Sequence, residues 1–295
     1  MLGLAWFLIS NTLANLELRR IASGFGFLGR EAGFEIGESF FLRYGAADSY
    51  LRALVVGLAN TLAVSAIGIV LATGLGTVVG LGRLSGNRLL RGLCTAYVEF
   101  VRNVPLLVQL FFWYAVITET LPIAREALEP LPGVFLSNRG IFFPTLSGTP
   151  VLQGFNFVGG SSISPEFAAL LLGLVTYTAG FIAEIVRAGV LSIVRGQWEA
   201  AQAIGLTRAQ TLRHVVLPQA LRVIVPPMTS QYLDLTKNSS LAVAIGYPDL
   251  VSIANTTVNQ TGQAIEGIAI IMGVYLTISL TISAFMNWYN ARVLR

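Results

Sequence analysis

Long runs without a charged side chain are the feature that most constrains the fold of this chain. Residues 53–82, 167–183 and 267–291 contain no Asp, Glu, Lys or Arg. A helix needs about 20 mostly apolar residues to cross a bilayer, where every backbone polar group must be bonded within the protein. With 54% hydrophobic and 12% charged residues, the chain is too apolar for an ordinary soluble domain. The sequence therefore predicts an all-α, multi-pass membrane protein.

Five core transmembrane helices account for the membrane domain that we expect in residues 51–295. Pro105 should kink the second of them, and Pro226 with Pro227 should break or bend the fourth, because proline removes a backbone donor and clashes with the preceding turn. Polar segments at residues 121–165 and 237–263 are predicted to lie outside the membrane, the first of them as short helices and turns. The five predicted crossings are residues 53–82, 95–118, 166–187, 219–236 and 267–291.

The first 50 residues form a separate N-terminal segment in this prediction. Residues 1–16 are apolar but shorter than a full helical crossing, so we expect a short first span that is tilted or trimmed. Residues 17–50 are polar and rich in glycine, which indicates a loop or a segment on the membrane surface.

Arginine positions orient the predicted spans. Arg83, Arg88 and Arg91 follow the first long run directly, and arginines gather again between residues 187 and 222 and at the end of the sequence. Basic residues are enriched in the cytoplasmic loops of membrane proteins. These ends of the spans are therefore expected in the cytoplasm.

A polar helical stretch, residues 191–218, separates the third and fourth crossings; we call it the elbow. Glu199 stands early in a short helix that Gly205 is expected to end. Thr207 and Gln210 have the capping-box spacing for a second short helix, which Pro218 should interrupt. Two short helices joined at a glycine can dock into a partner. The plainer alternative is an amphipathic surface pair without a partner.

Few residues in the chain could support catalysis or nucleotide binding. Lys237 is the only lysine and follows Thr236, so the chain contains no Gly-Lys-Ser/Thr phosphate-binding loop. One cysteine, Cys94, and one histidine, His214, exclude an intrachain disulfide and leave no His/Cys set for zinc. We therefore expect no cofactor or metal in this chain and no hydrolytic chemistry. Nucleic-acid binding is also disfavoured, because the net charge of +4 belongs to a membrane protein that sorts its basic residues by side.

Ionisable residues within the spans are costly and are candidates for a functional path. Opposite charges recur three residues apart, as in Glu184 with Arg187, and such residues are neighbours on a helix. Each pair either neutralises itself or faces a central path that accepts a zwitterion. We favour Glu184 for the path, because it follows a long uncharged run. The pairs are Glu99 with Arg102, Glu184 with Arg187 and Asp234 with Lys237, and the path candidates are Asn60, Arg102, Gln109, Glu184, Arg187, Lys237 and Asn238.

The elbow resembles the signature loop of the membrane-spanning subunits of bacterial ABC importers. The likeness rests on Glu199-Ala200-Ala201, Gly205 and Leu217-Pro218 at the spacing of that loop. Many relatives place proline where this chain has Val194, which leaves the entry angle of the first elbow helix open. Further similarity to polar amino-acid permeases lies in residues 97–111, 183–189 and 236–241, and similarity to the general L-amino-acid branch in residues 11–28.

The resemblance implies a type I ABC importer transmembrane domain in the bacterial inner membrane. Such a permease subunit would translocate polar L-amino acids together with a second permease subunit, two ATPase subunits that use ATP and Mg, and an external amino-acid-binding protein. In that family the loop forms a coupling helix seated on the ATPase. The matching residues here are Glu199, Ala200, Ala201, Gly205, Leu217 and Pro218.

Three rival functions remain at this stage: an ion-driven secondary transporter, a channel for small solutes and an intramembrane enzyme. A channel would not need the elbow. Secondary transporters are often built from internal repeats, and this sequence shows no such repeat.

Overall fold

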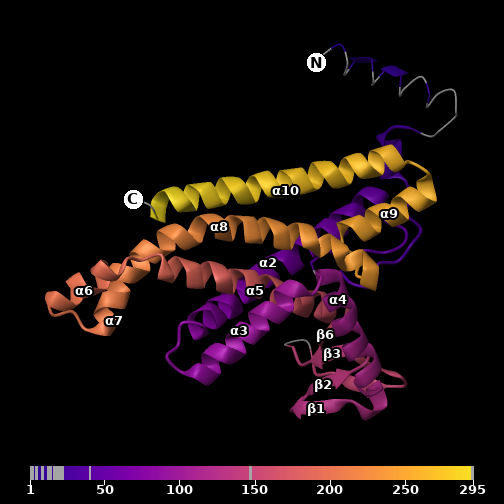
Figure 1. Ribbon diagram of the computed structural model, residues 1–295. Coiled ribbons are helices and arrows are strands. Elements are labelled where there is room, and N and C mark those ends of the chain that lie inside the picture. Colours follow the sequence, from indigo (N-terminus) through magenta and orange to yellow (C-terminus); the bar gives the residue numbers. More distant parts are fainter. Residues whose placement is uncertain are drawn as a thin grey trace. The chain divides into compact units, whose positions relative to one another are not determined.

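The computed structural model describes residues 23–39, 41–145 and 148–293, with isolated positions before residue 23. The short first span expected in residues 1–16 therefore falls mostly outside the described residues. The chain divides into two units, which Figure 1 shows in ribbon form. The first unit combines the chain up to Thr61 with Pro248–Ile278, and the second combines Leu62–Tyr247 with the residues from Ser279 onward.

Long helices occupy the predicted spans. Within the described residues, α2, α5 and α10 are each long and apolar enough to cross a membrane, and two bent helix pairs meet the same test jointly. The expected first, third and last crossings are thus confirmed as helices, while the total number of spans stays a prediction. The helices are α2 (Tyr50–Gly82), α3 (Arg88–Asn103), α4 (Leu106–Ala115), α5 (Pro165–Leu191), α6 (Arg195–Ala203), α7 (Arg208–Thr211), α8 (Leu217–Asn238), α9 (Leu250–Thr261) and α10 (Ala264–Val293).

The kink expected at Pro105 is a full break. Helix α3 ends at Asn103 and α4 begins at Leu106, with an angle of 105° across the break. The Gln109 side chain donates from Nε2 to the carbonyl oxygens of Val101 and Val104, at 2.8 and 3.0 Å. It thereby bonds carbonyls at the end of α3, which the continuing helix would otherwise have satisfied.

The prolines of the fourth crossing do not break its helix, although a break is one of the two effects predicted for them. Pro226 and Pro227 lie inside α8, which continues to Asn238 without a break. Membrane helices tolerate such prolines when the freed carbonyls find other partners. Pro218 stands in the first turn of α8, and the α-helical pattern of the second elbow helix is interrupted just before it, as predicted. A π-helical turn, Leu212–Val216, connects α7 to α8.

The two polar segments expected outside the membrane contain regular secondary structure. Residues 237–263 are mostly helical, comprising a 3-10 helix, Ser239–Ile245, and α9. The described residues between 121 and 165 form one short 3-10 helix and six short strands, so the expectation of short helices and turns is mostly wrong there. Strands β1, β2, β3 and β6 make an antiparallel sheet in that order, and β4 pairs with β5. The strands are β1 (Leu128–Leu131), β2 (Val134–Ser137), β3 (Gly140–Phe143), β4 (Val151–Gln153), β5 (Asn156–Val158) and β6 (Ser161–Ile163).

Close helix contacts in the second unit converge on α5. A Cβ atom at Gly173 would overlap the side chain of Leu110 in α4, and one at Gly180 would overlap Val101 in α3. On the α2 side, a Cβ at Gly80 would lie 2.7 Å from the Ala183 carbonyl oxygen. Small residues allow such approach between membrane helices, whose association depends on packing rather than on a hydrophobic driving force. Helix α5 is therefore the packing axis of this unit.

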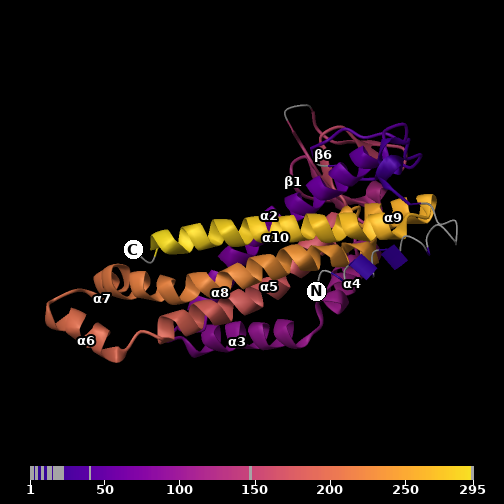
Figure 2. The same ribbon diagram turned by 90° about the horizontal axis from the view of Figure 1, so that it is seen from above.

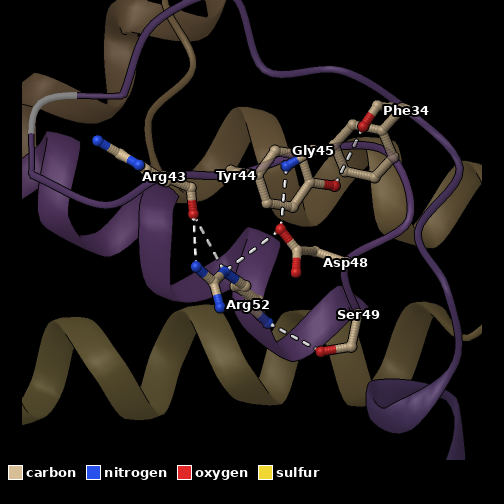
Figure 3. Close-up of polar contacts among 7 residues, drawn as sticks. All are labelled: Phe34, Arg43, Tyr44, Gly45, Asp48, Ser49 and Arg52. Carbon is tan, nitrogen blue, oxygen red and sulfur yellow. Dashed lines mark hydrogen bonds and ion pairs between the residues drawn. The ribbon is translucent and has the colours of Figure 1, made fainter.

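In the first unit, residues 23–49 form the loop that the sequence predicts, within the described part. It contains one short 3-10 helix, Phe25–Gly29, and its backbone is closed by a bond from Ala32 N to the Asp48 carbonyl oxygen at 2.8 Å. Figure 3 shows that Arg52 donates to the Arg43 carbonyl oxygen and pairs with Asp48 at 3.3 Å. These bonds fasten the loop to the start of α2.

The same loop also holds Tyr44 against its own backbone. Its hydroxyl donates to the Phe34 carbonyl oxygen at 3.1 Å (Figure 3). Burial raises the pKa of Tyr44 above its usual value, and the nearby Asp48 and Glu35 carboxylates add to that shift. The phenol therefore stays neutral at physiological pH and serves as a hydrogen-bond donor.

Two glycines on α2 test the packing at α5. Gly80→Ala should lower the thermal unfolding midpoint of the detergent-purified subunit, because the new methyl group meets the Ala183 carbonyl, and overpacking costs roughly 1–3 kcal/mol. A Cβ atom at Gly74 would meet nothing within 4 Å, so Gly74→Ala is the matched control. It should leave the midpoint unchanged or raise it, since alanine favours a helix over glycine by about 1 kcal/mol. Equal midpoints for the two variants would contradict close α2–α5 packing.

Candidate functional site

The elbow folds as two short helices joined at a glycine, as the sequence predicts. Gly205 follows α6 with a φ of +83°, a left-handed value that glycine adopts without steric cost. The capping box of α7 is complete: Thr207 N donates to Gln210 Oε1 at 2.9 Å, and Gln210 N donates to Thr207 Oγ1 at 3.4 Å. Within the second unit, Figures 1 and 2 both place α6 and α7 at the end of the helices remote from the strands.

The surface of the elbow carries apolar side chains. Ile204, at the turn, is 77% exposed, and Val194 and Leu212 are also exposed. Glu199 pairs with Arg195 at 3.0 Å, but both side chains are exposed, so this ion pair adds little stability. Exposed apolar side chains gathered on a polar segment are typical of a protein contact surface.

The predicted coupling residues lie on α6, at the Gly205 turn and at the start of α8. Ala200 is exposed on α6, whereas Ala201 is buried beneath it. Leu217 and Pro218 are exposed at the start of α8. A hydrogen bond from Gln219 Nε2 to Gln197 Oε1, 3.3 Å long, joins the start of α8 to α6. The structure thus brings these residues together in one folded segment.

Glu184 is held by two arginines. Arg187, one turn further along α5, donates from its NH2 group to Glu184 Oε1 at 2.5 Å. Arg83, just beyond the end of α2, forms an ion pair with the other carboxylate oxygen. We call these three residues the arginine–glutamate cluster. The predicted pairing of Glu184 with Arg187 is therefore confirmed, and Arg83 adds a second cation to it.

The other two predicted pairs do not form. Among the described residues, no ion pair joins Glu99 with Arg102 or Asp234 with Lys237. The Arg102 guanidinium instead lies over the Phe181 ring, 5.1 Å from its centroid. Helical neighbours pair only when their side chains turn toward each other, and here an aromatic face competes for the cation.

A small polar depression lies between α5 and α8, which we call the polar hollow. It has a volume of about 140 Å³, and Phe181, the residue under Arg102, is part of its wall. An exposed carboxylate, Asp234, and the Asn238 amide also face it. The hollow is lined by Tyr177, Thr178, Phe181, Gln231, Asp234 and Asn238.

Two path candidates instead serve the fold. The Asn60 amide is buried and donates from Nδ2 to the carbonyl oxygens of Glu38 and Pro248, both at 2.9 Å. Gln109 is buried and bonds the end of α3, as described above. Amide groups committed to backbone carbonyls are poorly placed to meet a passing solute.

Sequence reasoning missed the role of Arg83 and most of the wall of the hollow. The sequence indicates Arg83 only as a marker of the cytoplasmic side, because its bond to Glu184 joins residues 101 positions apart. The helical spacing of Tyr177, Phe181 and Glu184 along α5 is a usable signal, because residues three or four apart share one helix face.

The described part of the chain offers no metal centre. No group of three or more His, Cys, Asp or Glu side chains is arranged there to hold an ion.

In sequence, this chain is similar to proteins that are named as amino-acid permeases. The putative amino-acid ABC transporter permease protein YhdX of Escherichia coli is 46% identical, over 99% of this chain and 90% of its own length. The general L-amino acid transport system permease protein AapQ of Rhizobium johnstonii is 42% identical, over 99% of this chain and 89% of its own length.

Solved structures show the same fold. An amino acid ABC transporter crystallised with histidines matches with a TM-score of 0.61 at 24% identity, covering 82% of this chain and 95% of that one. The MetNI methionine ABC transporter in an inward-facing conformation matches with a TM-score of 0.58 at 20% identity, covering 82% and 97%. The fold is thus that of an ABC importer transmembrane domain.

The family comparison covers most of the chain. Residues 72–295 match the family described as binding-protein-dependent transport system inner membrane component. This range includes the elbow, the polar hollow and the arginine–glutamate cluster. The chain therefore belongs to the family of inner-membrane components of binding-protein-dependent transport systems.

Proposed function

We propose that this chain is the membrane-spanning subunit of an ATP-driven importer of polar L-amino acids in a bacterial inner membrane. An external amino-acid-binding protein delivers the substrate. A second permease subunit completes the path, and two ATPase subunits bind ATP and Mg, while this chain binds neither.

The elbow is the observation that carries the proposal. It is a folded, capped pair of helices that exposes Ile204 and Ala200, and it follows directly from α5. Because the arginines near it favour a cytoplasmic position, its apolar surface faces the compartment that holds ATP. Closure of two ATPase subunits would move the elbow and, through α5 and α8, rock the helices around the substrate path. Such coupling requires that the elbow make different contacts in the two states.

The substrate class is supported by the names of the relatives and by the polar hollow. AapQ is named as a general L-amino acid permease, and BztB of Rhodobacter capsulatus, 36% identical over 99% of this chain, as a glutamate/glutamine/aspartate/asparagine permease. In this chain Asp234 and Arg102 stand near one hollow without pairing with each other. A zwitterion offers an ammonium group to the first and a carboxylate to the second.

A channel or an ion-driven transporter explains less of the structure. Neither needs an exposed, capped elbow on the cytoplasmic side. Co-purification separates these functions: an ATPase bound to this chain in detergent supports the importer, and a chain that never binds one favours the rivals.

Substitution at the elbow turn tests coupling. Gly205→Val should leave the subunit in the membrane but abolish most amino-acid uptake by the assembled complex, because a left-handed φ costs a side-chain-bearing residue roughly 1–2 kcal/mol and shifts the turn. Uptake and ATP hydrolysis are measured together in proteoliposomes. Gly196→Ala in α6 is the control, since a Cβ there meets nothing within 4 Å. Normal uptake by the Gly205→Val complex would count against the proposal.

Substitutions at the hollow test substrate recognition. Asp234→Asn and Arg102→Gln should each raise the KM for amino-acid uptake roughly tenfold, the effect of removing one charge-assisted hydrogen bond of about 1.4 kcal/mol. Glu99→Gln is the matched control, because Glu99 is exposed on the same helix as Arg102 but lies outside the wall of the hollow. An unchanged KM in both variants would remove the hollow from the path.

A further inference from the structure

One face of α5 carries two aromatic residues at the hollow and, further toward the elbow, two charged residues. Tyr177 and Phe181 form part of the wall of the hollow. Glu184 and Arg187 follow at three-residue steps, so all four side chains share one face of the helix. The arginine–glutamate cluster therefore lies on the α5 face that borders the hollow, one to two turns nearer the elbow.

The cluster is not electrically neutral. Two guanidinium groups meet one carboxylate, which leaves a formal charge of +1. Arg83 is only 10% exposed, and its Nε atom is buried without an acceptor in the described structure. Glu184 and Arg187 are 28% and 32% exposed. Glu184 and Arg187 are thus partly accessible, and the cluster as a whole keeps an excess cation.

We infer that the arginine–glutamate cluster is a charge filter on the amino-acid path, which favours substrates with anionic side chains over those with cationic ones. This inference rests on the proposed function. The α-ammonium and α-carboxylate groups of an amino acid cancel each other, so the cluster distinguishes substrates by the side chain alone. In a partly dehydrated site an excess charge acts more strongly than it does in bulk water. Glutamate is attracted, glutamine is little affected and lysine is repelled.

Two substitutions shift the charge of the cluster in opposite directions. Arg187→Gln removes the excess cation, and Glu184→Gln increases it to two positive charges. The test measures initial uptake of labelled glutamate, glutamine and lysine by the complete complex in proteoliposomes, with the same saturating binding protein throughout. Because the contribution of the binding protein is common to all variants, it cancels when the glutamate-to-glutamine ratio is compared between them.

Opposite shifts of the ratio are the expected result. The glutamate-to-glutamine ratio should fall roughly threefold to tenfold in Arg187→Gln and rise in Glu184→Gln, the size expected of a partly screened unit charge. The lysine-to-glutamine ratio should move the other way. Arg187→Lys keeps the charge and should keep the wild-type ratio. Arg91→Gln is the matched control, because Arg91 is exposed on α3 and forms no ion pair among the described residues.

A merely structural role gives a different result. Loss of packing or register would lower uptake of all three amino acids together and leave the ratios unchanged, which would overturn the inference while the importer assignment stands. Absence of all amino-acid uptake by the wild-type complex would instead refute the proposed function.

Discussion

Close approach of helices at glycine is the constraint on which the second unit depends. Membrane helices gain no hydrophobic driving force from one another, so their contacts must come from packing at short distance. Helix α5 packs closely against three other helices. Leu110 of α4 lies against Gly173, and Val101 of α3 lies against Gly180. On the α2 side, Gly80 lies against the backbone of α5. A side chain at any of these glycines would separate two helices. The position of every group that α5 carries is set by this packing.

This packing leaves one face of α5 for function. Tyr177 and Phe181 open into the hollow, the arginine–glutamate cluster follows, and the elbow begins where the helix ends. A single continuous helix therefore links the place proposed for the substrate with the place proposed for the motor. The cap at Thr207 and the left-handed turn at Gly205 suit the proposed coupling, since a loosely held segment would absorb a displacement rather than pass it to the spans.

Much of this arrangement is predictable from sequence because it is local. Uncharged runs identify α2, α5 and α10, and the capping box identifies the start of α7. What escaped prediction depends on residues far apart in the chain. The strands between α4 and α5 are stabilised by pairing such as that of β3 with β6, and the bond from Arg83 to Glu184 joins two helices. Pro226 and Pro227 do not break α8, because membrane helices tolerate proline where the freed carbonyl groups find other partners.

Crosslinking from the elbow tests the central claim most directly. A single cysteine at Ala200, introduced after Cys94→Ser, is treated with a short bifunctional thiol reagent in membranes that hold the complete complex. We expect a product that joins this chain to an ATPase subunit, whereas a cysteine in β3, which Figure 1 places away from the elbow within the same unit, gives none. Labelling of the Ala200 cysteine by an impermeant reagent from outside intact cells, without any link to an ATPase, would contradict this expectation.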